Sequence, residues 1–145
     1  MPNASELAQD RLAYFPHDSN ASNDIKCQRL IRRLGWSGYG RWWRVCELLA
    51  SNKGHVIPFS TEEDKLILGD VLQFGGDSNF CELLCIEEVT AFVDQLLSIG
   101  LLQTDENGCL ENPRMHENAL SFGKKRAAGR KGGRPRKNPQ PNQNA

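Results

Sequence analysis

The chain lacks a run of about eighteen apolar residues, so no segment is long enough to span a membrane as a helix. Its N-terminus also lacks a basic stretch followed by an apolar one, which is the pattern of a signal peptide. We therefore expect a cytoplasmic protein with no membrane partner. Its five cysteines are an odd number in a reducing compartment and are predicted to be free thiols.

Motifs of catalysis are also missing. The sequence contains no phosphate-binding glycine loop ending in Lys-Ser or Lys-Thr, no His-Glu-x-x-His and no nucleophile elbow. Cys81 and Cys85 are spaced to share a metal, but no second pair lies near them, and the histidines at 17, 55 and 116 are scattered. We predict a protein that is not an enzyme and has no cofactor, no metal and no small-molecule substrate.

Acidic residues are absent from the C-terminal segment 123–145. That segment holds eight Lys and Arg, whereas residues 1–122 hold ten Lys and Arg against eighteen Asp and Glu, so the zero net charge conceals an acidic body and a basic tail. Such cationic density favours contact with nucleic acid. The alternatives are a solubilising or localisation tail, or a segment that folds back on the acidic body. The predicted phosphate-contacting residues are Lys124, Lys125, Arg126, Arg130, Lys131, Arg134, Arg136 and Lys137.

The tail also lacks apolar residues larger than alanine, so we expect residues 123–145 to be disordered. The stretch Gly133-Arg134-Pro135-Arg136-Lys137 resembles the core of an AT-hook, which lies in the minor groove of A·T-rich DNA. Gly132 stands where the first arginine of the hook belongs, so half of the motif is present. A phosphate-binding tail without base preference is the interpretation we favour.

Apolar periodicity divides the remainder into elements. We predict a loose N-terminus over residues 1–13, helices over 22–34 and 39–51 separated at Gly35, and a short strand over 55–59. Of the adjacent Trp42 and Trp43, only one can point fully inward. A capping box at Ser60-Thr61-Glu62-Glu63 opens a helix that extends through Leu72 and ends at Gly75-Gly76.

The next elements predict a winged helix-turn-helix. Asn79 caps a short helix over 80–84, Cys85-Ile86 forms a break, and a second helix covers 87–99. Asp105-Glu106-Asn107-Gly108 joins two short extended runs as a hairpin, which would be the wing. A last helix covers 113–122. The fold class is mainly α, with a winged-helix domain over residues 14–122.

Two stretches of this sequence carry a family resemblance. Residues 14–21, Tyr-Phe-Pro-His-Asp-Ser-Asn-Ala, and residues 35–43, Gly-Trp-Ser-Gly-Tyr-Gly-Arg-Trp-Trp, resemble the opening of phage replisome-organiser N-terminal domains. These are DnaD-like winged-helix proteins of phages and prophages. The helix that runs into the wing over 92–102, and a tail like that over 129–137, are similar to theirs as well. The resemblance implies DNA binding during replication initiation.

Charge divides the predicted domain. Residues 61–122 hold two Lys and Arg against thirteen Asp and Glu, so the helix over 87–99 is expected to face a protein through Glu87, Glu88 and Asp94 rather than to read DNA. Residues 22–60 hold seven Lys and Arg against two acids. Lys26, Arg29 and Arg33 share one helix face, either as phosphate contacts or as a solvated face paired with acids.

These observations predict a DNA-binding protein of phage or prophage replication, with DNA as one partner and a helicase, a loader or a second copy as another. The alternatives are a small transcriptional regulator of the same fold, or a protein-interaction adaptor.

Overall fold

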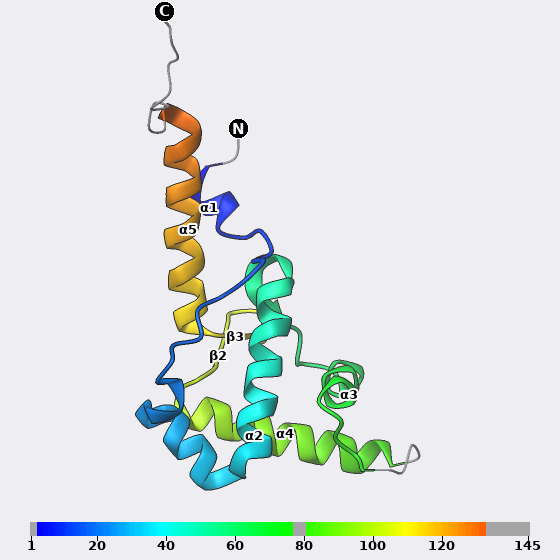
Figure 1. Ribbon diagram of the computed structural model, residues 1–145. Coiled ribbons are helices and arrows are strands. Elements are labelled where there is room, and N and C mark those ends of the chain that lie inside the picture. The colour runs from blue at the N-terminus through cyan, green and yellow to red at the C-terminus, as the bar shows by residue number, and fades with distance from the viewer. Residues whose placement is uncertain (1–2, 77–80, 133–145) are drawn as a thin grey trace, which may run out of the picture.

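The computed structural model describes residues 3–76 and 81–132, with the backbone alone for 130–132. Five α-helices occur in this part of the chain: α1 (Ala4–Leu7), α2 (Ile25–Ser51), α3 (Glu62–Val71), α4 (Glu82–Ile99) and α5 (Pro113–Gly132). Short 3-10 helices cover Ala21–Asn23 (η1) and Lys53–His55 (η2). The fold is mainly helical, as predicted (Figure 1). No helix among the described residues combines the length and apolar character needed to cross a membrane.

A small antiparallel sheet joins three regions of the chain. Its strands are β1 (Val56–Ile57), β2 (Gln103–Thr104) and β3 (Leu110–Glu111), in the order β1-β3-β2. In the central strand β3, Leu110 pairs with Ile57 on one side and with Thr104 on the other. The predicted hairpin is confirmed. Asp105 closes its turn, because one carboxylate oxygen accepts the backbone N–H groups of Asn107 and Cys109, both at 2.8 Å.

Helix α2 covers both of the first two predicted helices except for residues 22–24, which form the end of η1 and the cap. Asp24 caps it by accepting the N–H of Lys26 at 3.0 Å. At Gly35 the backbone has φ 72° and ψ −171°, a conformation that favours glycine, so α2 bends there into two arms. The prediction for the adjacent tryptophans is also confirmed, since Trp42 is buried and Trp43 is partly exposed.

The predicted break at Cys85-Ile86 is wrong, because α4 is one continuous helix. The N–H of Cys85 donates to the carbonyl of Cys81 at 3.1 Å, and its side chain packs where α3 crosses α4 against Gly69. Neither residue 85 nor 86 disfavours a helix strongly enough to overcome this packing. Asn79, Phe80 and the helix start proposed there lie outside the described residues.

Helix α3 begins one residue later than predicted. Thr61 is its cap and Asp64 completes the reciprocal box, instead of Ser60 and Glu63. The helix ends at Val71, before the predicted Gly75-Gly76 stop.

Two segments predicted to be loose or disordered contain helical residues in the described part of the chain. Helix α5 does not end at residue 122 but continues to Gly132, because its lysines, arginines and alanines are good helix formers. The N-terminal segment is also ordered: α1 lies along α5, with Leu7 and Ala8 buried (Figure 1). Gly123, taken as the boundary of a loose tail, is the buried residue where α5 meets α1.

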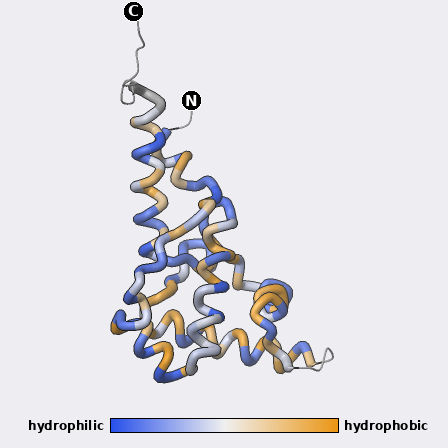
Figure 2. The backbone as a smooth tube through the Cα atoms, viewed as in Figure 1, coloured by the Kyte–Doolittle hydropathy of each residue, from blue (hydrophilic) through white to orange (hydrophobic). Residues whose placement is uncertain are grey.

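The main core lies where α2 and α4 meet the sheet. Both helices contribute side chains with no exposed surface, namely Leu30, Val45, Leu49, Val89 and Leu96. The almost fully buried Leu110 of β3 packs in the same core. Figure 2 shows the most hydrophobic stretches in α3 and α4, whereas α5 alternates between polar and weakly apolar residues. Helix α5 is therefore positioned mainly by its first turns and by α1.

Candidate nucleic-acid interface

The cations of α5 lie on a helix that projects from the body of the protein (Figure 1). Lys124 and Lys125 are exposed, and Lys125 Nζ lies 5.9 Å from the centre of the Phe122 ring. Arg126 differs, because its guanidinium lies 3.3 Å from a carboxylate oxygen of Asp10, with both side chains about half exposed. Exposed ion pairs of this kind contribute at most about 1 kcal/mol, so a phosphate can replace Asp10 as the partner of Arg126.

The remaining tail cations follow these residues in the sequence. Arg130 and Lys131 belong to α5, but only their backbone is described. Arg134, Arg136 and Lys137, and with them the partial AT-hook, lie outside the described residues.

The first arm of α2 carries the three other predicted phosphate contacts, Lys26, Arg29 and Arg33. Their surroundings in the structure differ. Lys26 Nζ donates to the carbonyl of Gly100 at 3.2 Å, at the negative end of the α4 dipole. Arg33 donates to Gln95 Oε1 at 3.0 Å. Arg29 is exposed and makes no hydrogen bond or ion pair with the described residues. Lys26 and Arg33 thus fasten α2 to α4, and of these three cations only Arg29 has no partner among the described residues.

Arg41 has a structural role that the sequence pattern did not indicate. Its Nε donates to the carbonyl of Leu72 at 2.8 Å and its Nη2 to that of Gln73 at 3.3 Å. The guanidinium carbon also lies 4.1 Å above the ring of Phe74. Arg41 therefore satisfies carbonyls at the C-terminal end of α3. No local pattern pairs residues so far apart in the sequence.

The three predicted protein-facing acids also have different surroundings. Glu87 and Asp94 are exposed on α4 and make no hydrogen bond or ion pair with the described residues. Glu88 accepts the backbone N–H of Gly75 at 2.8 Å, which fixes the segment that follows α3. Glu88 is thus engaged within the chain, whereas Glu87 and Asp94 remain available to a partner.

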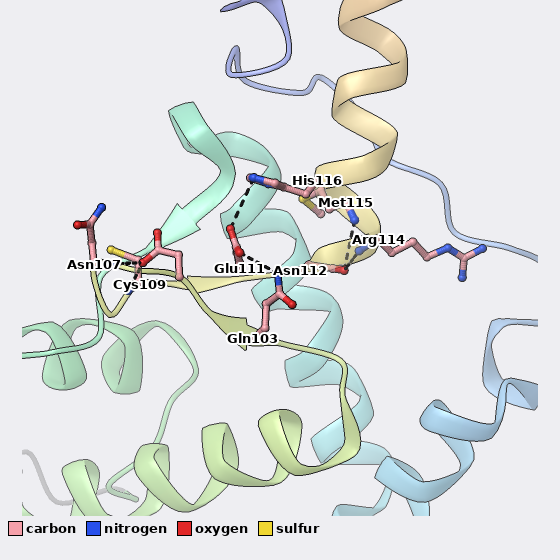
Figure 3. A network of polar contacts seen from close by, with 9 residues as sticks. Gln103, Asn107, Cys109, Glu111, Asn112, Arg114, Met115 and His116 are labelled. Carbon is pink, nitrogen blue, oxygen red and sulfur yellow. Dashed lines mark hydrogen bonds and ion pairs between the residues drawn. The ribbon is translucent and has the colours of Figure 1, made fainter. Parts of the chain in front are cut away.

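A buried carboxylate fixes the base of α5 on the sheet (Figure 3). Glu111 in β3 accepts a hydrogen bond from Gln103 of β2 at 2.8 Å, and its other oxygen lies 3.6 Å from His116 Nε2 of α5. Asn112 caps α5 by accepting the N–H of Arg114 at 3.0 Å. These contacts set the direction in which α5 carries its cations. The sequence pattern did not single out Glu111.

Burial makes four of the five thiols weaker acids. Burial raises the pKa of the Cys46 thiol to about 12, and burial is also the first cause that raises the pKa of Cys27, Cys85 and Cys109. Cys81 is exposed while Cys85 is buried, so the spaced pair is divided between surface and core. Over residues 3–76 and 81–132, no cluster of three His, Cys, Asp or Glu could hold a metal ion.

A pocket of about 570 Å³ lies beneath the segment that precedes α2. Its walls include Trp42, Cys46, Asp24 and Arg114. Asp24 is engaged as a helix cap, and Arg114 is largely exposed beside Asp18 at 3.2 Å. We assign no ligand to this pocket.

Together these features define a small helical domain that carries a basic helix on its sheet. The chain belongs to the family described as Lin1244/Lin1753-like, N-terminal, whose model matches residues 14–110. Neither the curated proteins nor the solved structures give a significant match. The matched range includes α2 and α4, whereas α1 and the basic helix α5 lie outside it.

Proposed function

We propose that this chain is a winged-helix protein that binds DNA. The order α2-β1-α3-α4-β2-β3, with the sheet order β1-β3-β2, is the arrangement expected of that fold. In this proposal α3 and α4 form the helix-turn-helix, so α3 takes the place of the short helix predicted over 80–84, and residues 105–108 form a short wing.

The contact with DNA is made mainly by α5 and the segment that follows it. The observation that carries this proposal is the separation of charge: exposed Lys124 and Lys125 stand on a projecting helix, whereas α4 exposes Glu87 and Asp94. A carboxylate at a groove repels phosphates, and lysines attract them. The proposed α4 surface therefore faces a protein.

The replication role rests on the resemblance of residues 14–21 and 35–43 to phage replisome organisers. In that role the protein binds DNA through α5, and the acidic face of α4 engages a helicase or its loader. A replication organiser is encoded beside helicase or loader genes, whereas a transcriptional regulator of the same fold binds its own promoter. Binding assays with a co-encoded helicase and with the promoter fragment separate these roles.

A salt-titrated binding measurement tests the DNA contact. Eight tail cations can neutralise at most eight phosphates, which gives a log–log salt slope of up to roughly −7. The double change Lys124→Gln and Lys125→Gln is expected to weaken duplex binding and to reduce the slope by about 2, at about 0.9 per phosphate.

The control removes the same charge elsewhere, through Arg44→Gln with Lys65→Gln on α2 and α3. It is expected to change the slope far less. Equal affinity and slope in the α5 variant and the unaltered chain would show that α5 does not contact DNA. Equal losses in both double variants would show that only net charge matters.

A further inference from the structure

The first part of α2 has no acidic residue. Residues 25–46 contain six Lys and Arg and neither Asp nor Glu. Four of the six have partners within the chain: Lys26 and Arg33 bond to α4 and the residue after it, Arg41 holds the end of α3, and Arg44 pairs with Glu47 at 3.1 Å. The other two are Arg29 and Arg32, which are exposed and have no ion pair or hydrogen bond among the described residues.

An exposed indole lies directly beyond these arginines, at the bend of α2. Trp36 is 68% exposed, although its size and apolar character favour burial. The neighbouring Gly35 turns the chain there, and α2 continues at an angle to its first arm (Figure 1). Solvent therefore reaches much of an aromatic surface that follows Arg32 by four residues and Arg29 by seven, two cations without a partner among the described residues.

Aromatic contacts hold this indole in place. The ring of Tyr39 meets that of Trp36 edge-on, with the centroids 5.7 Å apart and the planes at 80°. Tyr39 in turn meets Trp43 at 6.1 Å, and Trp43 stacks on His17 at 3.6 Å. The series connects the exposed ring to the packed body of the domain. A ring held in this way loses less conformational entropy when a ligand stacks on it.

We propose that the bend of α2 is a binding site for single-stranded DNA, with one base stacked on Trp36 and phosphates held by Arg29 and Arg32. Every base has a π-face that an indole can cover, and stacking needs a base that is not already stacked between neighbours. The site therefore selects unpaired bases, whereas the α5 cations bind any phosphate backbone. This inference deepens the proposed DNA-binding function and rests on it.

Charge favours a nucleic acid over a protein at this site. The acid-free stretch over 25–46 attracts a polyanion along its length, and an apolar protein surface would leave Arg29 and Arg32 without partners. The competing occupant is the acidic α4 face of a second copy of this chain. That occupant would make Trp36 a residue of self-association, which the experiment below also measures.

The test compares an oligo(dT) single strand with a mixed-sequence duplex, by fluorescence anisotropy on the full chain. Trp36→Ala is expected to weaken single-strand binding by about 5- to 150-fold, which corresponds to the loss of one aromatic stacking contact. Duplex binding should change less than about twofold, because paired bases do not reach the indole. Trp36→Phe should retain most of the single-strand affinity.

Leu83→Ala is the matched control, because Leu83 is an apolar side chain of α4 that is 67% exposed. It is expected to leave both affinities unchanged. Circular dichroism and sedimentation accompany each variant, so that a loss of folding or a change in oligomeric state is seen directly. Changing Arg29 and Arg32 to Gln should lower the single-strand salt slope by about 1.4, at about 0.7 per phosphate.

Three results would overturn the inference. Single-strand affinity unchanged in Trp36→Ala excludes stacking at this residue. An equal loss for single strand and duplex excludes selection of unpaired bases. A shift from oligomer to monomer, with DNA binding intact, assigns Trp36 to self-association. If the unaltered chain binds neither single-stranded nor duplex DNA, the proposed function itself fails. If the unaltered chain binds duplex and Trp36→Ala binds single strands as well as the unaltered chain does, only this inference is refuted.

Discussion

Two glycines of α5 allow a direct test of how the N-terminal segment is held. A Cβ added at Gly123 would meet the carbonyl oxygen of Ala4, the backbone nitrogen of Ala8 at 2.8 Å and the Ala8 Cβ at 3.1 Å. Backbone atoms cannot rotate away from such a contact, so α1 must move. At Gly129, in the same helix, an added Cβ meets nothing within 4 Å. Gly123→Ala and Gly129→Ala therefore differ mainly in what surrounds the new methyl group.

The magnitudes follow from helix propensity and burial. Alanine is favoured over glycine inside a helix by about 1 kcal/mol, so Gly129→Ala should raise the free energy of unfolding by up to that amount. Gly123→Ala has the same advantage but displaces α1 and exposes Leu7, whose burial is worth about 1.5–3 kcal/mol. The freed segment regains conformational entropy, which offsets part of this loss. We expect Gly123→Ala to be less stable than Gly129→Ala by about 1–2 kcal/mol.

Urea unfolding followed by circular dichroism gives the two free energies, and limited trypsin digestion reports on α1. Arg11 is exposed just after the ordered N-terminal segment. Mass spectrometry of the released N-terminal peptide should show faster cleavage at Arg11 in Gly123→Ala than in Gly129→Ala. If both variants are equally stabilised and Arg11 is cleaved at the same rate, then α1 does not pack on Gly123 as described.

Further predictions concern α4 and η2. Changing Glu87 and Asp94 together to Ala should leave stability unchanged and DNA binding steady or slightly tighter. A co-encoded partner should bind this variant less well in a pull-down. A marked loss of sequence-specific DNA binding would contradict the proposal that α4 faces a protein. Glu88→Ala should instead lower the free energy of unfolding by about 1 kcal/mol, measured by urea titration, because Gly75 N–H loses its acceptor. Burial lowers the pKa of His55 from its ordinary 6.5. The hydrogen bond to the Asp10 carbonyl raises this pKa but does not outweigh burial, so the folded state prefers the neutral ring. Stability should then be complete above about pH 6.5 and fall as the pH is lowered further, as followed by thermal unfolding, and His55→Asn should remove this dependence.

Local patterns predicted the elements whose signals are confined to short stretches of sequence. Periodicity placed both arms of α2, and the Asp-Glu-Asn-Gly segment over 105–108 placed the hairpin. The continuity of α4 was missed because a break was predicted at Cys85-Ile86. In the structure the Cys85 side chain packs where α4 crosses α3, and the helix continues through it. The length of α5 was missed because a charged segment with no large apolar residue cannot fold alone. Here the charged segment extends a helix whose first turn is capped by Asn112 and held on the sheet beside Glu111, so no new helix has to be nucleated.

The cations of α2 show what residue spacing can and cannot predict about a candidate interface. The spacing of Lys26, Arg29 and Arg33 correctly indicates which side chains share a helix face, but it carries no information about what lies opposite that face. Opposite it is the end of α4, where Gly100 presents a carbonyl to Lys26 and Gln95 an amide oxygen to Arg33. These groups are neutral, so the contacts fasten α2 without cancelling its charge. Lys26 and Arg33 already use donors in these contacts and are held beside α4, whereas Arg29 has no such contact among the described residues. The first arm of α2 should therefore neutralise about one or two phosphates through Arg29 and Arg32, and contribute roughly −1 to −2 to a salt slope, instead of the larger value that its cation count suggests.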